Sequence, residues 1–375
     1  MILGINGIRL VVKRSGVARA IEAILKNLDE LEHPFTDIRV YTPTPLDAST
    51  VLPRMGRNVV LPSALPYGWW EQVTLPLGHG GQGLLLCPSY IQPLLPGCPT
   101  FLIHHGSYEG YPQAFDAWTL RKAHLMYALS AWRATGVSTV SEFSRRDMAR
   151  YYRIPADRVA VVPEGVDTAL FRPLTDRGAV ESWRRATLGG DVPFVTYVGK
   201  PTERRNLSAL IRAFAELKRA HGIPHKLLIV GADLPGTSPF RQVIAELGLD
   251  AEVVIKGHVT HEEMVLVYNG ATCLVYPSSY EGFGMPVLEA MACGTPVITL
   301  DNTAFPEFAG GVALLLPDAR IETLAGGIKR VIDDAALRAR MAADGPRRAA
   351  AYDWRLVTQR YVNLMVPIAE AEADR

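Results

Sequence analysis

The sequence has little cysteine, no long apolar run and almost no excess of charge. Its four cysteines form no CxxC pair, and several lie in apolar runs typical of buried thiols, so a reducing cytoplasm is the simplest location. A formal net charge of +1 gives no case for a nucleic-acid-binding protein. No window is apolar enough to span a bilayer, and the N-terminus lacks the pattern of a signal peptide. We therefore expect a cytoplasmic protein.

The length and composition indicate a two-domain enzyme. A chain of 375 residues is too long for one ordinary hydrophobic core. The apolar fraction of 48% and charged fraction of 21% are typical of soluble globular enzymes. Buried strands alternate with helical patterns, which favours an α/β class with parallel sheets. We expect an N-terminal domain over residues 1–172 and a C-terminal domain over residues 191–352.

The most informative segment covers residues 280–296, YEGFGMPVLEAMACGTP. Two glycines within Glu281–Gly284 indicate a turn, and Pro286 suits the first turn of a helix because that position needs no N–H. Apolar residues between positions 287 and 292 predict a short buried helix, which ends at Gly294.

Two predicted strands enclose this loop and helix, over residues 273–277 and 296–300. A strand, glycine loop, helix and strand leave backbone N–H groups at the strand ends, where they suit a phosphate or a sugar. Glu281 and Glu289 lie in this unit. Their spacing alone also fits a solvated loop charge and an ion-pair partner.

The segment EGFGMPVLE resembles the donor loop of glycosyltransferase family 4, whose members are retaining nucleotide-sugar enzymes with the GT-B fold. That fold has two Rossmann-like domains facing a cleft, and its C-terminal helix, here residues 355–375, crosses back to the first domain. The resemblance implies that Glu281 addresses the transferred sugar and Glu289 holds the ribose. Other implied donor contacts are Phe283, Gly284, Met285 and Pro286.

A first strand is predicted over residues 1–12, followed by a turn into a helix. A helix N-terminus after a first strand suits an anion, and the resemblance implies that Gly16 approaches the donor diphosphate. The family usually has a second glycine where this chain has Ala18. An ordinary strand–helix turn is the alternative.

A buried strand over residues 99–103 places His104 at its carboxyl end, where α/β enzymes carry their chemistry. The family has a histidine here, and the resemblance implies that His104 positions or polarises the sugar. Two residues depart from the family pattern: His105 replaces an aspartate, and Glu164 replaces an asparagine. A lone histidine is otherwise more often a satisfied hydrogen-bonding residue.

Arg204 and Arg205 precede a predicted helix, for which Asn206 or Ser208 is the expected cap. Two guanidinium groups at a positive helix start suit a diphosphate, and the ligand is their expected partner in place of a buried protein charge. The resemblance also implies that Val259 contacts the nucleotide base.

The expected chemistry needs no metal or cofactor, because the sequence contains no D-x-D pair to bridge an ion to the donor. The resemblance implies hexose transfer, with GDP-mannose as the favoured donor and a lipid-linked or oligosaccharide acceptor in surface-polysaccharide assembly. It also implies at most peripheral membrane contact. A sugar phosphorylase of the same fold and a non-catalytic nucleotide-sugar-binding protein remain open.

Two further patterns are weaker. Trp69 and Trp70 suit either the core or an acceptor or lipid contact, and we favour the core. The glycines of residues 80–83 precede a strand, so they do not fit a dinucleotide fingerprint.

Overall fold

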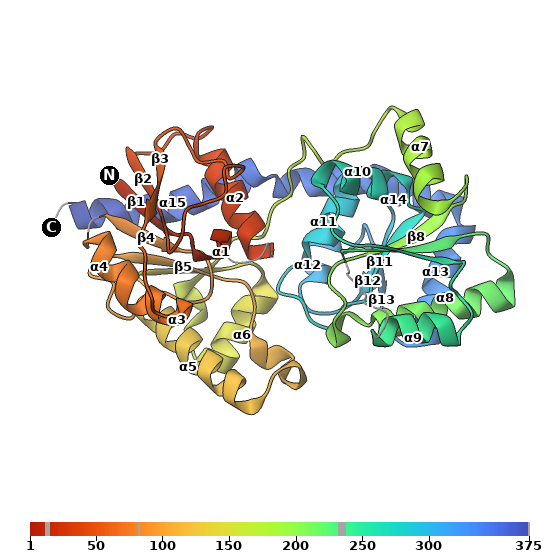
Figure 1. Cartoon of the computed structure of the whole chain (residues 1–375), viewed down its shortest axis with the longest axis horizontal. Coiled ribbons are helices and arrows are strands. Elements are labelled where there is room, and N and C mark those ends of the chain that lie inside the picture. Colours follow the sequence, from red (N-terminus) through yellow and green to blue (C-terminus); the bar gives the residue numbers. More distant parts are fainter. Residues whose placement is uncertain (12–15, 82, 232–237, 374–375) are drawn as a thin grey trace. The chain divides into compact units, whose positions relative to one another are not determined.

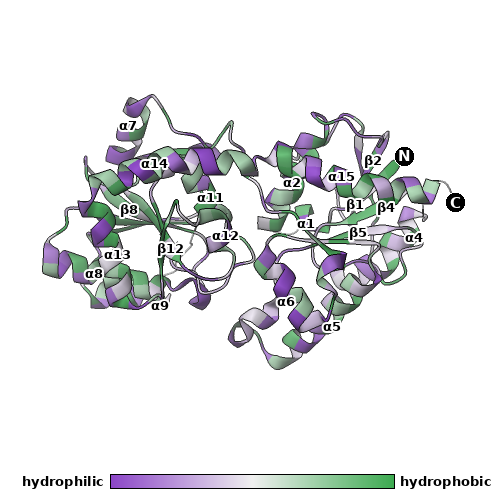
Figure 2. Cartoon of the chain, turned by 180° about the vertical axis from the view of Figure 1, so that it is seen from behind, coloured by the Kyte–Doolittle hydropathy of each residue, from purple (hydrophilic) through white to green (hydrophobic). Residues whose placement is uncertain are grey.

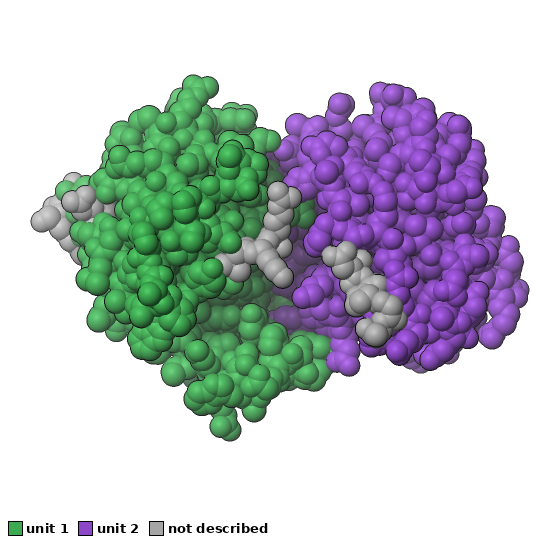
Figure 3. Space-filling model, in the orientation of Figure 1, with its two compact units in different colours: residues 1–165, 354–375 green, residues 166–353 purple. Residues whose placement is uncertain are grey.

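A computed structural model of the chain describes residues 1–11, 16–81, 83–231 and 238–373. The chain divides into two compact units, one formed by Met1–Gly165 with Trp354–Arg375 and the other by Val166–Asp353 (Figure 3). Each unit has its own parallel sheet with helices packed against it (Figure 1). The predicted α/β fold class, with two parallel-sheet units, is confirmed.

The described residues of the first unit form a seven-stranded parallel sheet in the order β3-β2-β1-β4-β5-β6-β7. Its central strands are buried on both faces, which explains their nearly continuous apolar sequences (Figure 2). The strands are β1 (Ile2–Asn6), β2 (Asp37–Thr42), β3 (Gly56–Val60), β4 (Leu84–Cys87), β5 (Thr100–His104), β6 (Gly136–Thr139) and β7 (Val159–Val161).

Each longer helix of the first unit buries one face. In α2 this face carries Ile21, Ile24, Leu25 and Leu28 at helical spacing. The hydroxyl of Ser141 caps α6 by accepting a hydrogen bond from Ser144 N at 3.0 Å. The helices are α1 (Ile8–Val11), α2 (Gly16–Leu28), α3 (Tyr67–Trp69), α4 (Leu75–His79), α5 (Ala117–Arg133), α6 (Glu142–Tyr152) and α15 (Trp354–Ala373), with a π-helical turn η1 (Trp70–Thr74) between α3 and α4.

The first strand is shorter than predicted. It ends at Asn6, whereas the sequence pattern extended it to residue 12, and Ile8–Val11 is helical. The side-chain oxygen of Asn6 accepts a hydrogen bond from Ile8 N at 3.2 Å, which turns the backbone out of the sheet. The predicted strand was wrong there because apolar residues of a short buried helix cannot be told from those of a strand.

The described residues of the second unit form a six-stranded parallel sheet in the order β10-β9-β8-β11-β12-β13. Its strands are β8 (Phe194–Val198), β9 (Lys226–Val230), β10 (Val253–Lys256), β11 (Cys273–Tyr276), β12 (Val297–Leu300) and β13 (Leu314–Leu316). The helices are α7 (Arg177–Leu188), α8 (Leu207–His221), α9 (Pro239–Glu246), α10 (His261–Gly270), α11 (Met285–Ala292), α12 (Phe305–Ala309), α13 (Ile321–Asp333) and α14 (Ala335–Ala349), with a 3-10 turn η5 (Glu203–Arg205) before α8.

Both sheets reverse their strand order once near the middle. The reversal lies between β1 and β4 in the first unit and between β8 and β11 in the second. The loops that leave two such strands diverge at their carboxyl ends, and ligands of open α/β sheets bind in the crevice between them. The topology therefore selects the loops after β1, β4, β8 and β11.

The chain passes between the two units twice, at Gly165–Val166 and at Asp353–Trp354, and these two points lie close together within each unit. Within the second unit, Val166 forms a parallel bridge with Asp353, and Val166 N donates to the carbonyl of Tyr352 at 2.9 Å. Within the first unit, the Gly165 backbone packs on the Trp354 ring, where an added Cβ would lie 2.6 Å from Cδ2. No helix of the described chain has the length and apolar character needed to cross a bilayer.

The two adjacent tryptophans have opposite environments, which gives a stability prediction. Trp70 is fully buried and its indole N–H donates to the Leu61 carbonyl at 2.8 Å, whereas Trp69 is 62% exposed. We expect Trp70→Ala to lower the free energy of unfolding by about 3–5 kcal/mol. Trp69→Ala, the matched control, should change it by less than about 0.5 kcal/mol. Urea unfolding followed by circular dichroism measures both, and equal losses would contradict the assignment.

Candidate functional site

Two loops of the second unit are joined at the reversal between β8 and β11. Asn206 has a left-handed backbone, with φ of 52°, and its amide donates to Pro277 O at 2.8 Å and to the Ser279 hydroxyl at 2.7 Å. Asn206 is the N-cap residue of α8, one of the two predicted candidates, but its side chain binds the other loop and makes no capping hydrogen bond. Ser279 N also donates to Arg204 O at 2.7 Å.

Glu281 lies at the centre of this junction, as a single carboxylate oxygen with four donors. Its Oε1 lies 2.8 Å from Arg204 Nη1 and accepts from Arg205 Nε at 2.9 Å. The same oxygen accepts from the hydroxyls of Tyr276 at 2.8 Å and Ser278 at 3.1 Å. A ligand was the predicted partner of the two arginines in place of a buried protein charge, and this prediction is wrong because both arginines pair with Glu281.

The other atoms of the cluster keep free hydrogen-bonding capacity. Among the described residues, nothing donates to Glu281 Oε2, and Nη2 of Arg204 and of Arg205 has no partner. The three side chains are 11%, 26% and 17% exposed, respectively, so these atoms lie at a partly open surface. An acceptor oxygen beside two cationic donors suits a ligand with both a hydroxyl and a phosphate.

The charges of the cluster keep the carboxylate ionised. Burial alone would raise the pKa of Glu281, but the guanidinium groups of Arg205 and Arg204 outweigh it and hold that pKa below its usual value. At neutral pH, two cations and one anion therefore leave a net positive charge. This sign favours a diphosphate.

The glycine loop that follows Glu281 has the predicted form. Gly284 has a φ of 125°, and a Cβ there would lie 2.7 Å from Phe305 Cε1, so only glycine fits. Helix α11 then begins at Met285 with Pro286 in its first turn, which confirms the predicted short buried helix. Phe283 points away from solvent and stacks on Phe308 at 4.4 Å, so a donor would meet its backbone.

Glu289 lies inside α11 and already has a protein partner. Its side chain is 3% exposed, and Oε2 accepts a hydrogen bond from the Tyr268 hydroxyl at 2.9 Å. This bond orients the carboxylate from α10. The contact of Glu289 with a ribose stays a prediction.

The remaining expected donor contacts lie in separate loops. Val259 is half-buried in the segment between β10 and α10, at the carboxyl edge of the second sheet. Gly16 is the exposed first residue of α2, and Ala18 is buried beside it. Residues 12–15 of the same predicted turn lie outside the described residues. Contacts of Gly16 and Val259 with a donor stay predictions.

His104, at the end of β5, is fully buried among aromatic rings. The rings of Tyr90, Tyr127 and Tyr152 lie 5.1, 5.5 and 5.4 Å from its imidazole. Its Nε2 has no hydrogen-bond partner among the described residues. Burial and the neighbouring His105 lower the pKa of His104 to about 3, so the ring is neutral at physiological pH. Its predicted contact with the sugar stays a prediction.

Tyr90 was missed by the sequence analysis. It follows β4, at the strand reversal of the first sheet, and has a φ of 63°, a conformation that is unusual for a bulky residue. Its ring contacts both His104 and His105 and stacks on Tyr127 at 5.1 Å. Backbone strain of this kind gathers at functional sites, but the sequence gives no signal for it.

His105 and Glu164, the two departures from the family pattern, bind each other. His105 Nδ1 lies 2.7 Å from Glu164 Oε1, and Nε2 lies 2.9 Å from the Pro88 carbonyl oxygen. Both partners are acceptors, so both ring nitrogens donate and the ring is an imidazolium. Burial opposes this charge, but Glu164 and the Pro88 carbonyl outweigh it and raise the pKa of His105.

Two more polar pairs lie at the same carboxyl edge of the first sheet. Asn6 Nδ2 donates to Glu71 Oε1 at 2.8 Å, and Arg9 Nε donates to the Ser89 hydroxyl at 2.7 Å. Burial raises the pKa of Glu71 to about 7 despite the Asn6 hydrogen bond. The sequence did not indicate Glu71 as a candidate site residue, because its neighbours Trp69 and Trp70 suggested only packing.

The buried pair predicts a pH-dependent stability. The raised pKa of His105 means that its contribution is complete below the unfolded pKa of about 6.5 and is lost as pH rises through the folded value. Glu164→Gln should therefore cost about 3 kcal/mol near pH 6 and markedly less near pH 9.

The matched control is His124→Gln, which removes the 47% exposed histidine that lies 2.8 Å from Glu109 Oε1. Its effect should change little with pH, because an ion pair with a solvent-exposed partner contributes little. Urea unfolding over this pH range measures both variants. A cost at Glu164 that is independent of pH would show that His105 is not an imidazolium.

Two family models match consecutive parts of the chain. The model described as Glycosyl transferases group 1 matches residues 180–348, and that described as Glycosyltransferase Family 4 matches residues 14–170. The O-antigen chain mannosyltransferase B of Escherichia coli is 27% identical over 60% of this chain and 59% of its own length. The chain thus spans between about half and three fifths of the curated relatives it matches.

Solved structures have the same fold over nearly their whole length. A sucrose-phosphate synthase from Thermosynechococcus elongatus has a TM-score of 0.80 and 21% identity, over 99% of this chain and 100% of that one. Anabaena HepE in complex with UDP and glucose has a TM-score of 0.77 and 20% identity, over 96% and 98%. The fold is GT-B, and the chain belongs to glycosyltransferase family 4.

Proposed function

We propose that the protein transfers a hexose from a nucleoside-diphosphate sugar to a hydroxyl group of an acceptor, with retention of configuration. The observation that supports this most is the cluster of Glu281, Arg204 and Arg205, which combines a free carboxylate oxygen with two free guanidinium nitrogens. A nucleotide sugar needs this pair of functions, since its sugar carries hydroxyls and its leaving group carries charge. HepE, of the same fold, binds UDP and glucose.

The residues act on the charge that develops as the sugar leaves. The bond between the anomeric carbon and the diphosphate oxygen breaks, and Arg204 and Arg205 stabilise the anion that forms. Glu281 Oε2 accepts a hydrogen bond from a sugar hydroxyl and orients the ring. The acceptor oxygen bonds to the same face of the anomeric carbon, and its proton passes to the departing phosphate oxygen.

We propose mannose from GDP-mannose as the donor sugar, with a lipid-linked or oligosaccharide acceptor in surface-polysaccharide biosynthesis. The support for mannose is the E. coli relative, an O-antigen chain mannosyltransferase. UDP-glucose is the alternative, in line with HepE. We propose that Val259 and Glu289 contact the nucleoside part of the donor.

We further propose that the protein is cytoplasmic and binds membranes peripherally, through the first unit. Exposed apolar side chains lie on α3–α4 and α5, which the segment of residues 91–95 joins through Gln72, Leu94 and Arg133. These side chains are Tyr67, Trp69 and Leu77 on α3–α4 and Trp118, Leu125 and Trp132 on α5, with Leu95 in the joining segment. Helix α5 has the cations Arg121, Lys122 and Arg133 and no acid, as suits an anionic membrane surface.

The function is tested with a panel of nucleotide sugars in excess chelator. One donor, which we expect to be GDP-mannose, should raise the melting temperature of the protein. The same donor should transfer its sugar to an acceptor or to water. Activity should persist without divalent ions, since the arginines replace the metal. Loss of transfer in chelator that manganese or magnesium restores would contradict the metal-free site, and turnover of sugar 1-phosphates alone would indicate a phosphorylase.

The two glutamates should affect different steps. Glu281→Gln should lower the transfer rate by about 10²-fold, because Oε2 meets the sugar. It should leave the affinity for free nucleoside diphosphate nearly unchanged, because the amide oxygen can still accept from Arg204 and Arg205. Glu289→Gln should weaken the free diphosphate and the intact donor alike. Calorimetric titration with GDP and UDP, beside kinetics with the donor, measures both. Equal loss of nucleotide affinity in the two variants would refute the division of roles.

If this surface contacts membranes, the protein should bind to vesicles of anionic lipid. The double variant Trp118→Ser/Leu125→Ser should reduce binding to vesicles of anionic phosphatidylglycerol by about tenfold, since each buried side chain contributes roughly 1.5–3 kcal/mol at most. Leu356→Ser, at a 49% exposed position on α15, is the matched control. Vesicle flotation measures the bound fraction. Equal binding by both variants would exclude this surface.

A further inference from the structure

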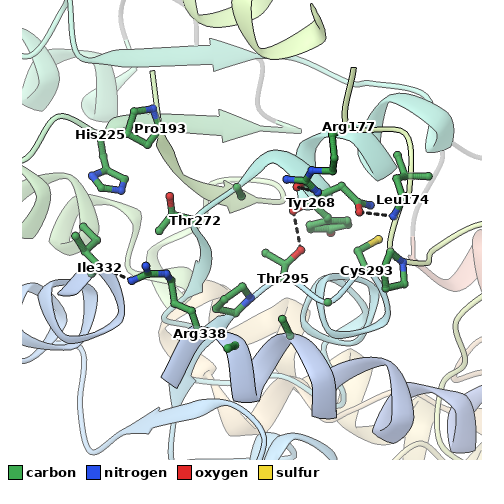
Figure 4. Close-up of a pocket in the computed structure, with 17 residues that line it drawn as sticks. Leu174, Arg177, Pro193, His225, Tyr268, Thr272, Cys293, Thr295, Ile332 and Arg338 are labelled. Carbon is green, nitrogen blue, oxygen red and sulfur yellow. Dashed lines mark hydrogen bonds between the residues drawn. The ribbon is translucent and has the colours of Figure 1, made fainter. Parts of the chain in front are cut away.

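The second unit contains a cavity far from the loops described above. Its volume is about 620 Å³, and Pro193, His225, Thr272 and Pro296 line it (Figure 4). These residues directly precede β8, β9, β11 and β12, so the cavity lies at the amino edge of the sheet. Glu281 and its arginines lie at the carboxyl edge. The cavity is therefore separate from the candidate donor site.

The charge of the lining has one sign. Arg177, Arg338 and His225 line the cavity and no aspartate or glutamate does. Arg177 Nη1 lies 3.4 Å from the Asn269 carbonyl, and Arg338 Nη1 donates to the carbonyls of Val331 at 2.7 Å and Ile332. Neither guanidinium has a carboxylate partner among the residues that the structure describes. Two guanidinium groups whose charge no carboxylate balances suit an anion.

His225 supplies an unsatisfied polar atom in the same lining. The residue is 6% exposed, and its Nδ1 has no hydrogen-bond partner among the described side chains and backbone. Burial, Arg338 and Lys218 lower the pKa of His225 to about 4, so the ring is neutral and one nitrogen donates while the other accepts. Buried polar atoms are normally paired, so this one indicates a missing partner.

One side of the cavity is formed by residues that contact or follow α11, the helix that carries Glu289. Tyr268 lines the cavity, and its hydroxyl donates to Glu289 Oε2 at 2.9 Å. Thr295, another lining residue, donates from its hydroxyl to the Tyr268 carbonyl at 2.7 Å, as Figure 4 shows. The end of α11 also contributes Cys293 and Gly294 to the lining. An occupant would thus contact the residues that orient Glu289.

We propose that this cavity binds a small phosphorylated metabolite and that the bound ligand tightens nucleotide binding by holding Tyr268 against Glu289. The phosphate contacts Arg338 and His225, and the rest of the ligand fills the space toward Tyr268. A volume of about 620 Å³ is within the usual range for small-ligand sites of roughly 300–1,000 Å³. The site itself is independent of the proposed function, whereas the regulation rests on it.

The site is tested first, with inorganic phosphate and glucose 6-phosphate as probes at matched ionic strength. Each should raise the melting temperature of the wild type by several degrees when the ligand is well above its dissociation constant. Ala339→Trp fills the cavity from α14 and should remove part or all of this shift. Ala343→Trp, at an exposed position of the same helix outside the lining, is the matched control and should keep it.

A second variant covers the case in which the tryptophan disturbs the helix. His225→Phe keeps a ring but removes the nitrogen that lacks a protein partner, so it should fold and should also reduce the shift. Binding at the arginines of the donor site is unaffected by either cavity variant. Equal shifts in the wild type, Ala339→Trp and His225→Phe would overturn the cavity site.

Regulation is tested by calorimetric titration of GDP and UDP with and without glucose 6-phosphate. The nucleotide that binds should do so at least about fivefold more tightly with the sugar phosphate present, in the wild type and in Ala343→Trp. Tyr268→Phe should abolish this gain while glucose 6-phosphate still stabilises the protein. Unchanged nucleotide affinity despite cavity binding would overturn the regulation, and a lack of any nucleotide binding would instead refute the proposed function.

Discussion

A single carboxylate oxygen with four donors sets the geometry of the second unit's functional edge. Glu281 Oε1 joins the turn after β8, through Arg204 and Arg205, to the end of β11 and the loop after it, through Tyr276 and Ser278. A buried carboxylate stays ionised only when it is paired and hydrogen-bonded. Because one oxygen meets that need, the other oxygen and the outer guanidinium nitrogens stay available for a ligand.

In the first unit, buried charged side chains are stabilised by separate pairs of residues in place of one cluster. At its carboxyl edge Asn6 binds Glu71, Arg9 binds Ser89 and His105 binds Glu164, so each of these charged side chains has a polar partner nearby. Tyr90 covers both histidines at the cost of an unusual backbone. The first unit thus presents a neutralised edge, in contrast to the net positive edge of the second. This division suits an uncharged hydroxyl acceptor on one unit and a diphosphate on the other.

Local patterns in the sequence predicted the parallel sheets, the glycine loop and the buried helix after it, because each depends on residues close together in the chain. They also placed His104 at a strand end. They could not show its burial, which depends on Tyr127 and Tyr152 from two later helices. The partners His105 and Glu164 lie 59 positions apart, and Asn206 bonds a loop 71 positions away. Such pairings are fixed by the fold and leave no local signature.

Because the ends of the second unit lie next to each other, this unit can be exchanged as a whole between related chains. Val166 is bridged to Asp353, and the Trp354 ring packs on Gly165, so the second unit is an insertion whose entry and exit lie side by side. A segment with neighbouring ends can be replaced without rethreading the rest of the chain. Exchange of residues 166–353 between relatives would thus transplant a complete sheet with its arginines and Glu281. Recombination between relatives therefore has two neighbouring crossover points, at Gly165–Val166 and at Asp353–Trp354.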